Sequence, residues 1–288
     1  MTDPSRTAPP AADPAALRLL AEGVARDAAE HLRGLPRPWD TGPAGGSVGT
    51  KSSPTDVVTA SDTAVEALIR ERLAALAPRD LIVGEEHGGV AGTDAERVVW
   101  VLDPIDGTVN FLYGLPWYAV SVAATRGGVT LAGAVVEPVS GRVWSAAAGQ
   151  GATCDGRPLA VSAVTELALS LVGTGFAYDA RRRGRQAALV AGLLPRIRDV
   201  RRTGSAALDM CAVAAGWTDA YLEHGCSWWD WAAAALVAQE AGAVVRVPGV
   251  AGLPDPDDGL GSDAILVAAP GIATELAALA RGHGAAEV

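Results

Sequence analysis

Apolar residues recur at helical spacing near the start of the chain. Residues 14–33 predict an amphipathic helix that ends near Gly34. Its apolar side carries Leu17, Leu20, Val24, Ala28 and Leu32. A Pro/Gly-rich loop is expected at residues 35–50, and a second helix after it, with Asp62 as its cap. The apolar face of that helix carries Val65, Leu68, Ile69, Leu73 and Leu76.

Beyond residue 80 the pattern is that of short strands. Residues 81–83 and 98–102 are apolar runs of the kind found in buried strands. Three apolar segments separated by glycine-containing turns then predict antiparallel hairpins, at residues 118–124, 131–137 and 142–148. Further strands are expected at 169–174, 220–223 and 264–268, and helices at 181–194, 205–216, 231–242 and 272–281. The expected fold class is therefore α/β, with mixed layers of helix and sheet.

The composition supports a globular domain preceded by a tail. The chain has 288 residues, of which 49% are hydrophobic, so it can bury a sizeable core. Residues 1–14 lack the apolar centre of a signal peptide and are expected to be a disordered tail. Residues 15–288 are expected to form a single domain with two subdomains, about 15–155 and 156–288.

Charge and cysteine content narrow the possible partners. The formal net charge of −10 argues against general binding to nucleic acid or to anionic membranes. No apolar run reaches the ~18 residues needed to span a bilayer. Three cysteines without C-x-x-C spacing are interpreted as reduced core thiols of a cytoplasmic protein. The histidines lie at no metal-ligand spacing, and we expect them at the surface.

The segment with the richest chemistry follows the apolar run at residues 98–102. It reads Asp-Pro-Ile-Asp-Gly-Thr, residues 103–108, and sets two carboxylates three positions apart where we expect a strand to end. The proline and glycine predict a backbone there that is neither regular helix nor strand. Oxygen ligands suit Mg²⁺, Mn²⁺ or Ca²⁺, while Gly107 and Thr108 add an open backbone, a hydroxyl and an N–H for a phosphate. Taken alone, the same residues also suit an ordinary turn.

Four more polar segments adjoin predicted elements. Residues 51–62 place polar groups before a helix, and Gly84-Glu85-Glu86 places two acids at a strand end. Gly204-Ser205-Ala206-Ala207 opens a helix, where free backbone N–H groups can receive an anion or a hydroxyl. Trp228-Trp229-Asp230 places an acid at the start of an apolar helix. Each segment alone has a common structural explanation, as a helix cap, a solvated turn or a helix start.

Together and in this order, these segments resemble the inositol monophosphatase family of Mg²⁺-dependent, Li⁺-sensitive phosphatases, and most of all its actinobacterial members. The resemblance covers roughly residues 15–280. It implies a layered αβαβα sandwich of the inositol monophosphatase and fructose-1,6-bisphosphatase type. It also implies a homodimer and a phosphoric monoester hydrolase with two to three Mg²⁺ ions per site.

The resemblance assigns roles to particular residues. Glu85 and Asp103 would bind the first metal with the Ile105 carbonyl, and Asp103 would also bind the second. The other ligands of the second metal would be Asp106 and Asp230. The attacking water would be oriented and deprotonated by Asp62 and Thr108. Glu86 would act beside the ligands, and Lys51 would lie in a loop that closes near the phosphate.

Substrate contacts follow from the same resemblance. Gly107 and Thr108 would contact the phosphate, and the sugar hydroxyls would be contacted by Gly204, Ser205, Ala206 and Glu223. Asp209 stands where some members carry Asn, so substrate preference could differ. The basic residues 181–183 and 201–202 are interpreted as a solvated face, although they could also attract an anionic substrate or partner.

Inositol monophosphate is the expected substrate, with some tolerance for other sugar and polyol phosphates. The alternatives within this resemblance are phosphatases for histidinol phosphate, fructose-1,6-bisphosphate or 3′-phosphoadenosine nucleotides. An alternative of another class is a regulatory binding protein in which phosphatase activity is secondary.

Overall fold

Two β-sheets run through the computed structural model, which describes residues 13–36, 48–50, 57–89, 96–250 and 257–288. The helices are α1 (Pro14–Gly34), α2 (Ala60–Leu76), α3 (Thr108–Tyr113), α4 (Ala180–Leu193), α5 (Ala206–Ala214), α6 (Trp228–Glu240) and α7 (Pro270–Gly282). The first strands are β1 (Val48–Thr50), β2 (Val57–Thr59), β3 (Leu81–Gly84), β4 (Val99–Asp106), β5 (Ala119–Arg126), β6 (Val129–Val136) and β7 (Val143–Ala147). The later strands are β8 (Ala152–Cys154), β9 (Arg157–Pro158), β10 (Leu171–Thr174), β11 (Asp199–Arg201), β12 (Ala220–His224), β13 (Val244–Arg246) and β14 (Ala264–Ala268).

The two sheets differ in topology. The first has the order β3-β4-β5-β6-β7-β8-β9, with β3 parallel to β4 and every later neighbour antiparallel. The predicted hairpins are therefore confirmed. The second sheet has the order β11-β10-β12-β14-β13, in which β10 is parallel to both of its neighbours. A separate pair, β1 and β2, is antiparallel.

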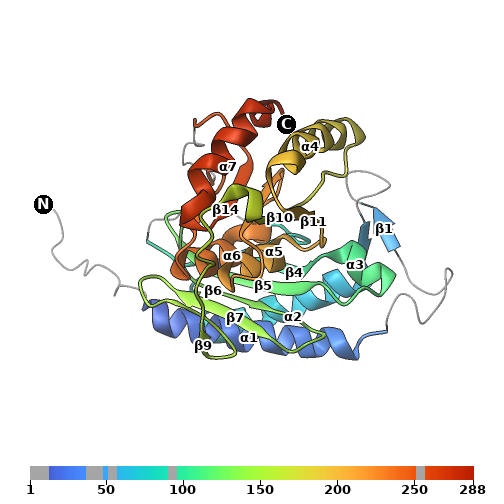
Figure 1. Cartoon of the computed structure of the whole chain (residues 1–288). Helices are drawn as coiled ribbons and strands as arrows, with labels where there is room; N and C mark the ends of the chain where they lie inside the picture. Colours follow the sequence, from blue (N-terminus) through green and yellow to red (C-terminus); the bar gives the residue numbers. More distant parts are fainter. Residues whose placement is uncertain (1–12, 37–47, 51–56, 90–95, 251–256) are drawn as a thin grey trace, which may run out of the picture.

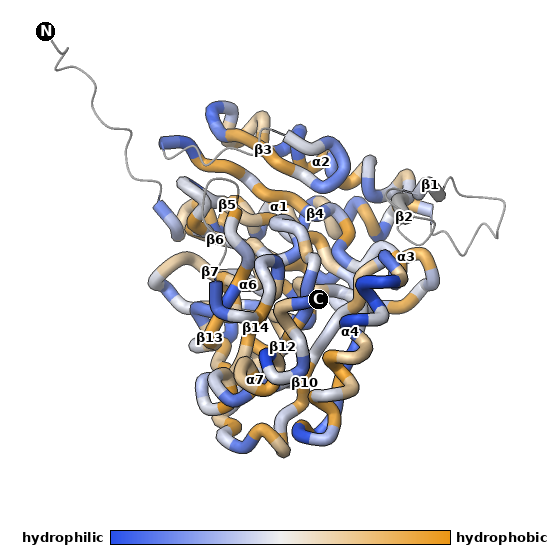
Figure 2. The backbone as a smooth tube through the Cα atoms, turned by 90° about the horizontal axis from the view of Figure 1, so that it is seen from above, coloured by the Kyte–Doolittle hydropathy of each residue, from blue (hydrophilic) through white to orange (hydrophobic). Residues whose placement is uncertain are grey.

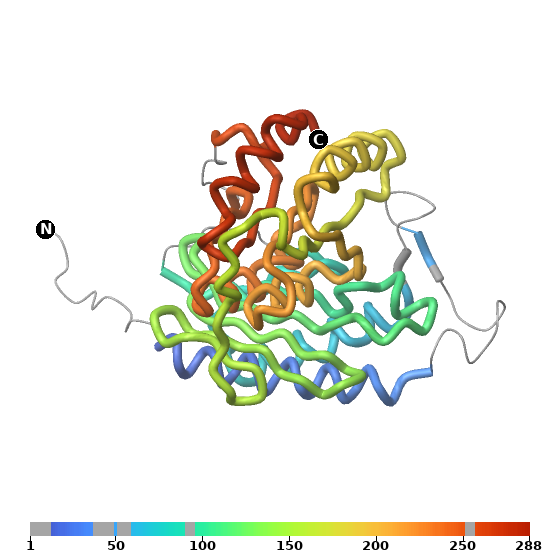
Figure 3. Tube along the Cα trace, viewed as in Figure 1, coloured from blue at the N-terminus to red at the C-terminus, as the bar shows by residue number. Residues whose placement is uncertain are grey.

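Helices and sheets stack in five layers, which confirms the expected αβαβα sandwich (Figure 1). Helices α1 and α2 cover one face of the first sheet, and α5 and α6 lie between the two sheets. Helices α4 and α7 cover the outer face of the second sheet. In Figure 3 the green strands of the first sheet lie between the blue helices and the orange ones, so segments far apart in sequence meet.

Alternating side chains on the strands explain why each sheet is covered on both faces. Trp100 and Leu102 of β4 pack toward α1 and α2, whereas Val99 and Val101 pack toward α5 and α6. The strands at the centre of the first sheet are accordingly hydrophobic for most of their length (Figure 2). Alanine-rich α6 lies so close to the sheet that a Cβ on Gly133 would lie 2.8 Å from the Cα of Ala233. The small residues of both elements permit this approach.

Three local expectations need correction. Strand β4 continues through the Asp-Pro-Ile-Asp segment to Asp106, with a shift in register between Asp103 and Asp106. The strand therefore does not end at residue 102, but the register shift agrees with the prediction that this segment is not a regular strand, since pairing with β5 resumes only at Asp106. The cap of α2 is Thr59, and Asp62, the third residue of the helix, is the partner of Thr59 in a capping box. Helix α6 begins at Trp228, three positions before the expected start.

Other sequence-based expectations have mixed outcomes. Helix α1 is confirmed, and Asp13 caps it, while residues 1–12 of the predicted tail and Lys51 lie outside the described residues. All three cysteines are free thiols. Among the helices of the described segments, none combines the length and apolar composition that crossing a membrane requires. The histidine expectation is wrong for His224, which is 3% exposed and contacts the Leu260 carbonyl through Nε2 at 2.7 Å.

Candidate active site

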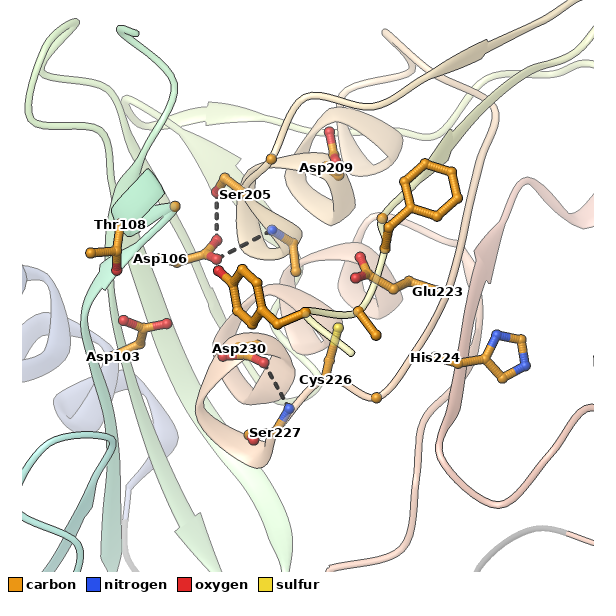
Figure 4. A pocket seen from close by; sticks show the side chains of 18 of the residues that line it. Asp103, Asp106, Thr108, Ser205, Asp209, Glu223, His224, Cys226, Ser227 and Asp230 are labelled. Carbon is orange, nitrogen blue, oxygen red and sulfur yellow. Dashed lines mark hydrogen bonds between the residues drawn. The ribbon is translucent and has the colours of Figure 1, made fainter. Parts of the chain in front are cut away.

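A pocket of about 480 Å³ opens beside the C-terminal end of β4. It gathers most of the residues that the sequence marked as ligands or substrate contacts (Figure 4). These are Glu85, Asp103, Ile105, Asp106, Gly107, Thr108, Gly204, Ser205, Ala206, Glu223 and Asp230. Residues from both sheets and from the helices between them thus converge on one cavity.

Parallel strands β3 and β4 place Glu85 beside Asp103. The backbone N–H of Glu85 donates to the Leu102 carbonyl at 3.2 Å, which continues the pairing of the strands to the point where both acids emerge. Asp103 is only 2% exposed, and its Oδ1 accepts the Ile105 N–H at 2.9 Å. Burial raises the pKa of Asp103 well above its usual range. The negative charges of Glu85, Asp106 and Asp230 raise it further.

Asp106 joins the end of β4 to the start of α5. Its carboxylate accepts hydrogen bonds from the Ser205 hydroxyl and from the backbone N–H groups of Ala206 at 3.3 Å and Ala207 at 2.8 Å. The helix-start N–H groups that were expected to be free for a ligand are therefore taken by Asp106. A carboxylate is favoured there because the N-terminus of a helix carries partial positive charge. Burial still raises the pKa of Asp106 to about 6, although these hydrogen bonds lower it.

Asp230 comes from the opposite side of the pocket, in the first turn of α6. Its Oδ2 accepts the backbone N–H of Ser227 at 2.7 Å, which completes a capping box. Burial raises the pKa of Asp230 well above its usual range, and the charges of Asp106 and Glu85 contribute. Helix capping thus fixes the backbone that carries this acid.

The donor set of this cluster fits a divalent cation. The charged groups with the largest effect on the pKa of Asp103 are all acids, so ionising the cluster requires a compensating positive charge. Carboxylate and carbonyl oxygens are the ligands that Mg²⁺ prefers. In the described part of the chain, no group of three or more acidic, histidine or cysteine side chains is arranged so that it could hold a metal ion. The fit therefore rests on charge and donor chemistry rather than on preformed ligand geometry.

Asp62 and Thr108 form a buried pair next to the acids. The Thr108 hydroxyl lies 3.1 Å from Asp62 Oδ1 and 3.0 Å from the Ile105 carbonyl oxygen, so its single proton can be donated to either. Asp62 Oδ2 accepts the backbone N–H of Thr59 at 2.8 Å. One oxygen of this carboxylate therefore completes the capping box of α2, and the other faces the pocket residue Thr108.

Two glycines allow the halves of the chain to approach each other at the pocket. Gly107 has φ of +98°, and a Cβ there would lie 3.2 Å from the Gly204 carbonyl oxygen. The Asn110 side chain joins the same two segments by donating to the carbonyls of Trp117 at 2.7 Å and Thr203 at 2.8 Å. Asn110 was not predicted as a site residue, because a single polar residue in an apolar segment carries no signal of such a bridge.

Comparison with known proteins agrees with this geometry. Residues 13–284 match the model of the inositol monophosphatase family. The chain belongs to this family. An inositol-1-monophosphatase of Mycobacterium leprae is 54% identical over 288 residues, which covers 96% of this chain and 97% of that protein. A Nus factor SuhB of Escherichia coli is 40% identical over 191 residues, 66% of this chain and 71% of that protein. The solved structure of Mycobacterium tuberculosis SuhB superposes with a TM-score of 0.78 at 46% identity, covering 96% of this chain and 99% of that one.

This member of the inositol monophosphatase family has a second group of polar residues at the far end of the pocket. The buried Tyr221 hydroxyl donates to Glu223 Oε2. Burial raises the pKa of Glu223, although that hydrogen bond and the charges of Arg202 and Arg182 lower it. Both arginines line the pocket, Arg182 as a half-buried residue and Arg202 as an exposed one, which favours the alternative that these basic residues attract an anionic substrate. Tyr221 was also missed, since a tyrosine in a strand is usually core.

Asp209 and Glu86 complete the predicted set. Asp209 is 3% exposed, lines the pocket and accepts a hydrogen bond from the Thr203 hydroxyl. Burial raises its pKa to about 8. Glu86 is half-buried, and its backbone N–H donates to Glu66 Oε2 at 2.7 Å. Glu66 had no predicted role and is fully buried.

Proposed function

We propose that this protein hydrolyses inositol monophosphate to inositol and inorganic phosphate, with Mg²⁺ held by the acidic cluster. The observation that supports this most is the convergence of Glu85, Asp103, Asp106 and Asp230 beside the Asp62–Thr108 pair. The near full-length similarity to inositol-1-monophosphatases supports the choice of substrate.

Asp62 and Thr108 activate the attacking water. Thr108 Oγ1 lies within hydrogen-bonding distance of Asp62 Oδ1. A water in front of Thr108 gives its proton to the hydroxyl oxygen while Thr108 passes its own proton to Asp62. The resulting hydroxide attacks phosphorus, the P–O bond to the inositol oxygen breaks, and that oxygen takes a proton from solvent water as inositol leaves. The fixed position of Asp62 at the start of α2 holds this pair for proton transfer.

Glu85, Asp103, Asp106, Asp230 and the Ile105 carbonyl would hold Mg²⁺, which would supply positive charge to stabilise an in-line displacement at phosphorus. The chain itself contributes positioning. Gly107 and Thr108 hold the phosphate close to the backbone at the turn after β4. Glu86 supports the neighbouring Glu85, while Lys51 lies outside the described residues and its contact with the phosphate stays a prediction from the resemblance.

The inositol ring occupies the part of the pocket that Glu223 lines. Glu223 accepts hydrogen bonds from ring hydroxyls, and its orientation is set by the Tyr221 hydroxyl. Gly204, Ser205 and Ala206 form the wall opposite, although the Ser205 hydroxyl and the Ala206 N–H are already directed at Asp106. At this wall the inositol ring is therefore contacted by Gly204 and by the backbone carbonyl groups of residues 204–206. A homodimer remains a prediction from the resemblance.

A substrate panel tests the proposal. Phosphate release is measured from inositol 1-phosphate, histidinol phosphate, fructose-1,6-bisphosphate and 3′-phosphoadenosine 5′-phosphate, each with Mg²⁺, with excess chelator, and with Mg²⁺ plus Li⁺. We expect Mg²⁺-dependent, Li⁺-inhibited hydrolysis with the highest kcat/KM on inositol 1-phosphate. Rates within tenfold across the panel would rule out a narrow inositol phosphatase, and full activity in chelator would rule out the metal.

A second candidate function is that of a regulatory binding protein, which the similarity to Nus factor SuhB of Escherichia coli favours. The two functions separate with Asp106→Asn. The amide oxygen still accepts the Ala207 N–H, so the start of α5 is retained while a ligand charge is lost. A cellular phenotype that survives this substitution, when hydrolysis has collapsed, would support the regulatory function.

A further inference from the structure

Glu66 is a buried acid that the proposed chemistry does not use. It lies on α2, one helical turn after Asp62, and is 0% exposed. Burying a carboxylate is unfavourable unless hydrogen bonds and a counter-charge compensate it. The hydrogen-bond donors and the counter-charge around Glu66 therefore indicate its role.

The partners of Glu66 lie almost entirely in the turn after β3. Its Oε2 accepts the backbone N–H of Glu86 at 2.7 Å, and its Oε1 accepts the backbone N–H of His87 at 3.1 Å. The Nδ1 atom of His87 lies 3.1 Å from the same oxygen. Arg70, one turn further along α2, donates to Glu66 Oε1 at 2.7 Å and also to the Gly88 carbonyl. Helix α2 therefore holds both sides of this turn.

Gly84 shows how closely the carboxylate approaches. A Cβ at this position would overlap the Glu66 carboxylate, so any other residue would displace that carboxylate from its present place. The backbone N–H of Gly84 also donates to the Gly88 carbonyl at 3.0 Å, which closes the turn. The glycine of the Gly-Glu-Glu segment is thus explained by the space that Glu66 needs.

Glu85 lies inside this arrangement. The residue before it packs against Glu66, and the residue after it donates to Glu66. The backbone N–H of Glu85 itself donates to the Leu102 carbonyl of β4 at 3.2 Å. The backbone of Glu85 and of both its neighbours is thus held in place, while the Glu85 side chain lines the pocket. Hydrogen bonds to a charged acceptor are stronger than neutral ones, which makes this a rigid support.

We propose that Glu66 is a positioning residue that holds Glu85 beside Asp103, so that both carboxylates can bind one divalent cation. This inference rests on the proposed function, because it needs Glu85 as a metal ligand. Asp62 and Glu66, four residues apart on α2, then serve the two sides of the site. Asp62 orients Thr108, and Glu66 orients Glu85.

Calorimetric titration of Mg²⁺ into wild type and Glu66→Gln tests the proposal. The amide keeps the size of the side chain but presents an NH₂ group to the backbone N–H donors, so the turn loses at least one hydrogen bond. We expect the Mg²⁺ dissociation constant to rise tenfold or more, since losing a partner that orients a ligand typically costs ~10–100-fold in metal affinity. At saturating Mg²⁺, kcat should stay near the wild-type value because Asp62 and Thr108 are untouched.

Glu71→Gln is the matched control. Glu71 is exposed on the same helix and the substitution removes the same charge, so Mg²⁺ affinity should not change. If Glu66→Gln bound Mg²⁺ as tightly as wild type and only its Tm fell, Glu66 would be merely structural and the proposal would be overturned.

Arg70→Gln decides the question if Glu66→Gln does not fold. The Arg70 side chain is 25% exposed, so its loss is better tolerated, yet it removes both the counter-charge of Glu66 and the contact with Gly88. We expect the Mg²⁺ dissociation constant to rise several-fold. If Arg70→Gln bound Mg²⁺ with wild-type affinity, the positioning role of Glu66 would be refuted but the proposed function would stand. If the wild-type protein itself bound no Mg²⁺, the proposed function would be refuted as well.

Discussion

Asp209 should make the stability of the metal-free protein depend more strongly on pH, and Asp209→Asn should remove the share of that dependence that Asp209 contributes. The folded-state pKa of Asp209 is about 8, against an ordinary value of 3.8, because the carboxyl is 3% exposed. Between these values the folded state keeps a proton that the unfolded state releases. The free energy of unfolding therefore falls as pH rises through this window.

The size of the effect follows from linkage. Each pH unit inside the window costs about 1.4 kcal/mol, so wild type should lose about 2.7 kcal/mol relative to Asp209→Asn between pH 5 and pH 7. Asparagine has no proton to release and can still accept the hydrogen bond of Thr203. The other buried acids titrate in both proteins, so their contribution cancels in the comparison.

Urea denaturation at pH 5, 6, 7 and 8 in the presence of chelator measures this difference. We expect the free energy of unfolding of Asp209→Asn, relative to that of wild type, to increase at each step up to pH 8. If the two free energies of unfolding ran parallel with pH, Asp209 would be ionised in the folded state, and the account of its burial would be wrong.

Two further substitutions test the proton-transfer pair and the ring contact. Thr108→Val removes the hydroxyl that lies 3.1 Å from Asp62, so kcat should fall by about 10²-fold or more. Mg²⁺ affinity, measured by calorimetry, should be retained. A kcat within threefold of wild type would show that Thr108 does not activate the water. Tyr221→Phe deletes the donor that orients Glu223, so the KM for inositol 1-phosphate should rise by about tenfold, with a smaller change in kcat. An unchanged KM in steady-state assays would contradict the proposed contact between Glu223 and the ring.

Much of the architecture was predictable because long elements carry a clear periodicity. The 21-residue α1 and the hairpins β5 to β7 have repeated apolar spacing and glycine-marked turns. Strands β11 and β13 have three residues each at the edges of the second sheet, too few for a period to show. Their pairing is decided by neighbours that lie far away in the sequence.

The acids of the site were predictable as residues but not as a network. The binding of the α5 N-terminus to Asp106 joins positions about one hundred residues apart, and no local pattern encodes it. Glu66 interrupts the apolar pattern of α2, and from the sequence alone a charged residue on a helix is expected to face solvent. Its burial becomes intelligible only once β3 brings Gly84 against the helix.

We propose that the buried carboxylates hold Mg²⁺ for phosphate release, with Asp103 at the centre of the cluster. The most direct measurement is the rate of phosphate release from inositol 1-phosphate as a function of Mg²⁺ concentration, for wild type and Asp103→Asn. We expect saturable Mg²⁺ dependence in wild type and loss of the activity in the variant, with folding confirmed by circular dichroism. Mg²⁺-independent hydrolysis, or equal rates in the two proteins, would contradict the account.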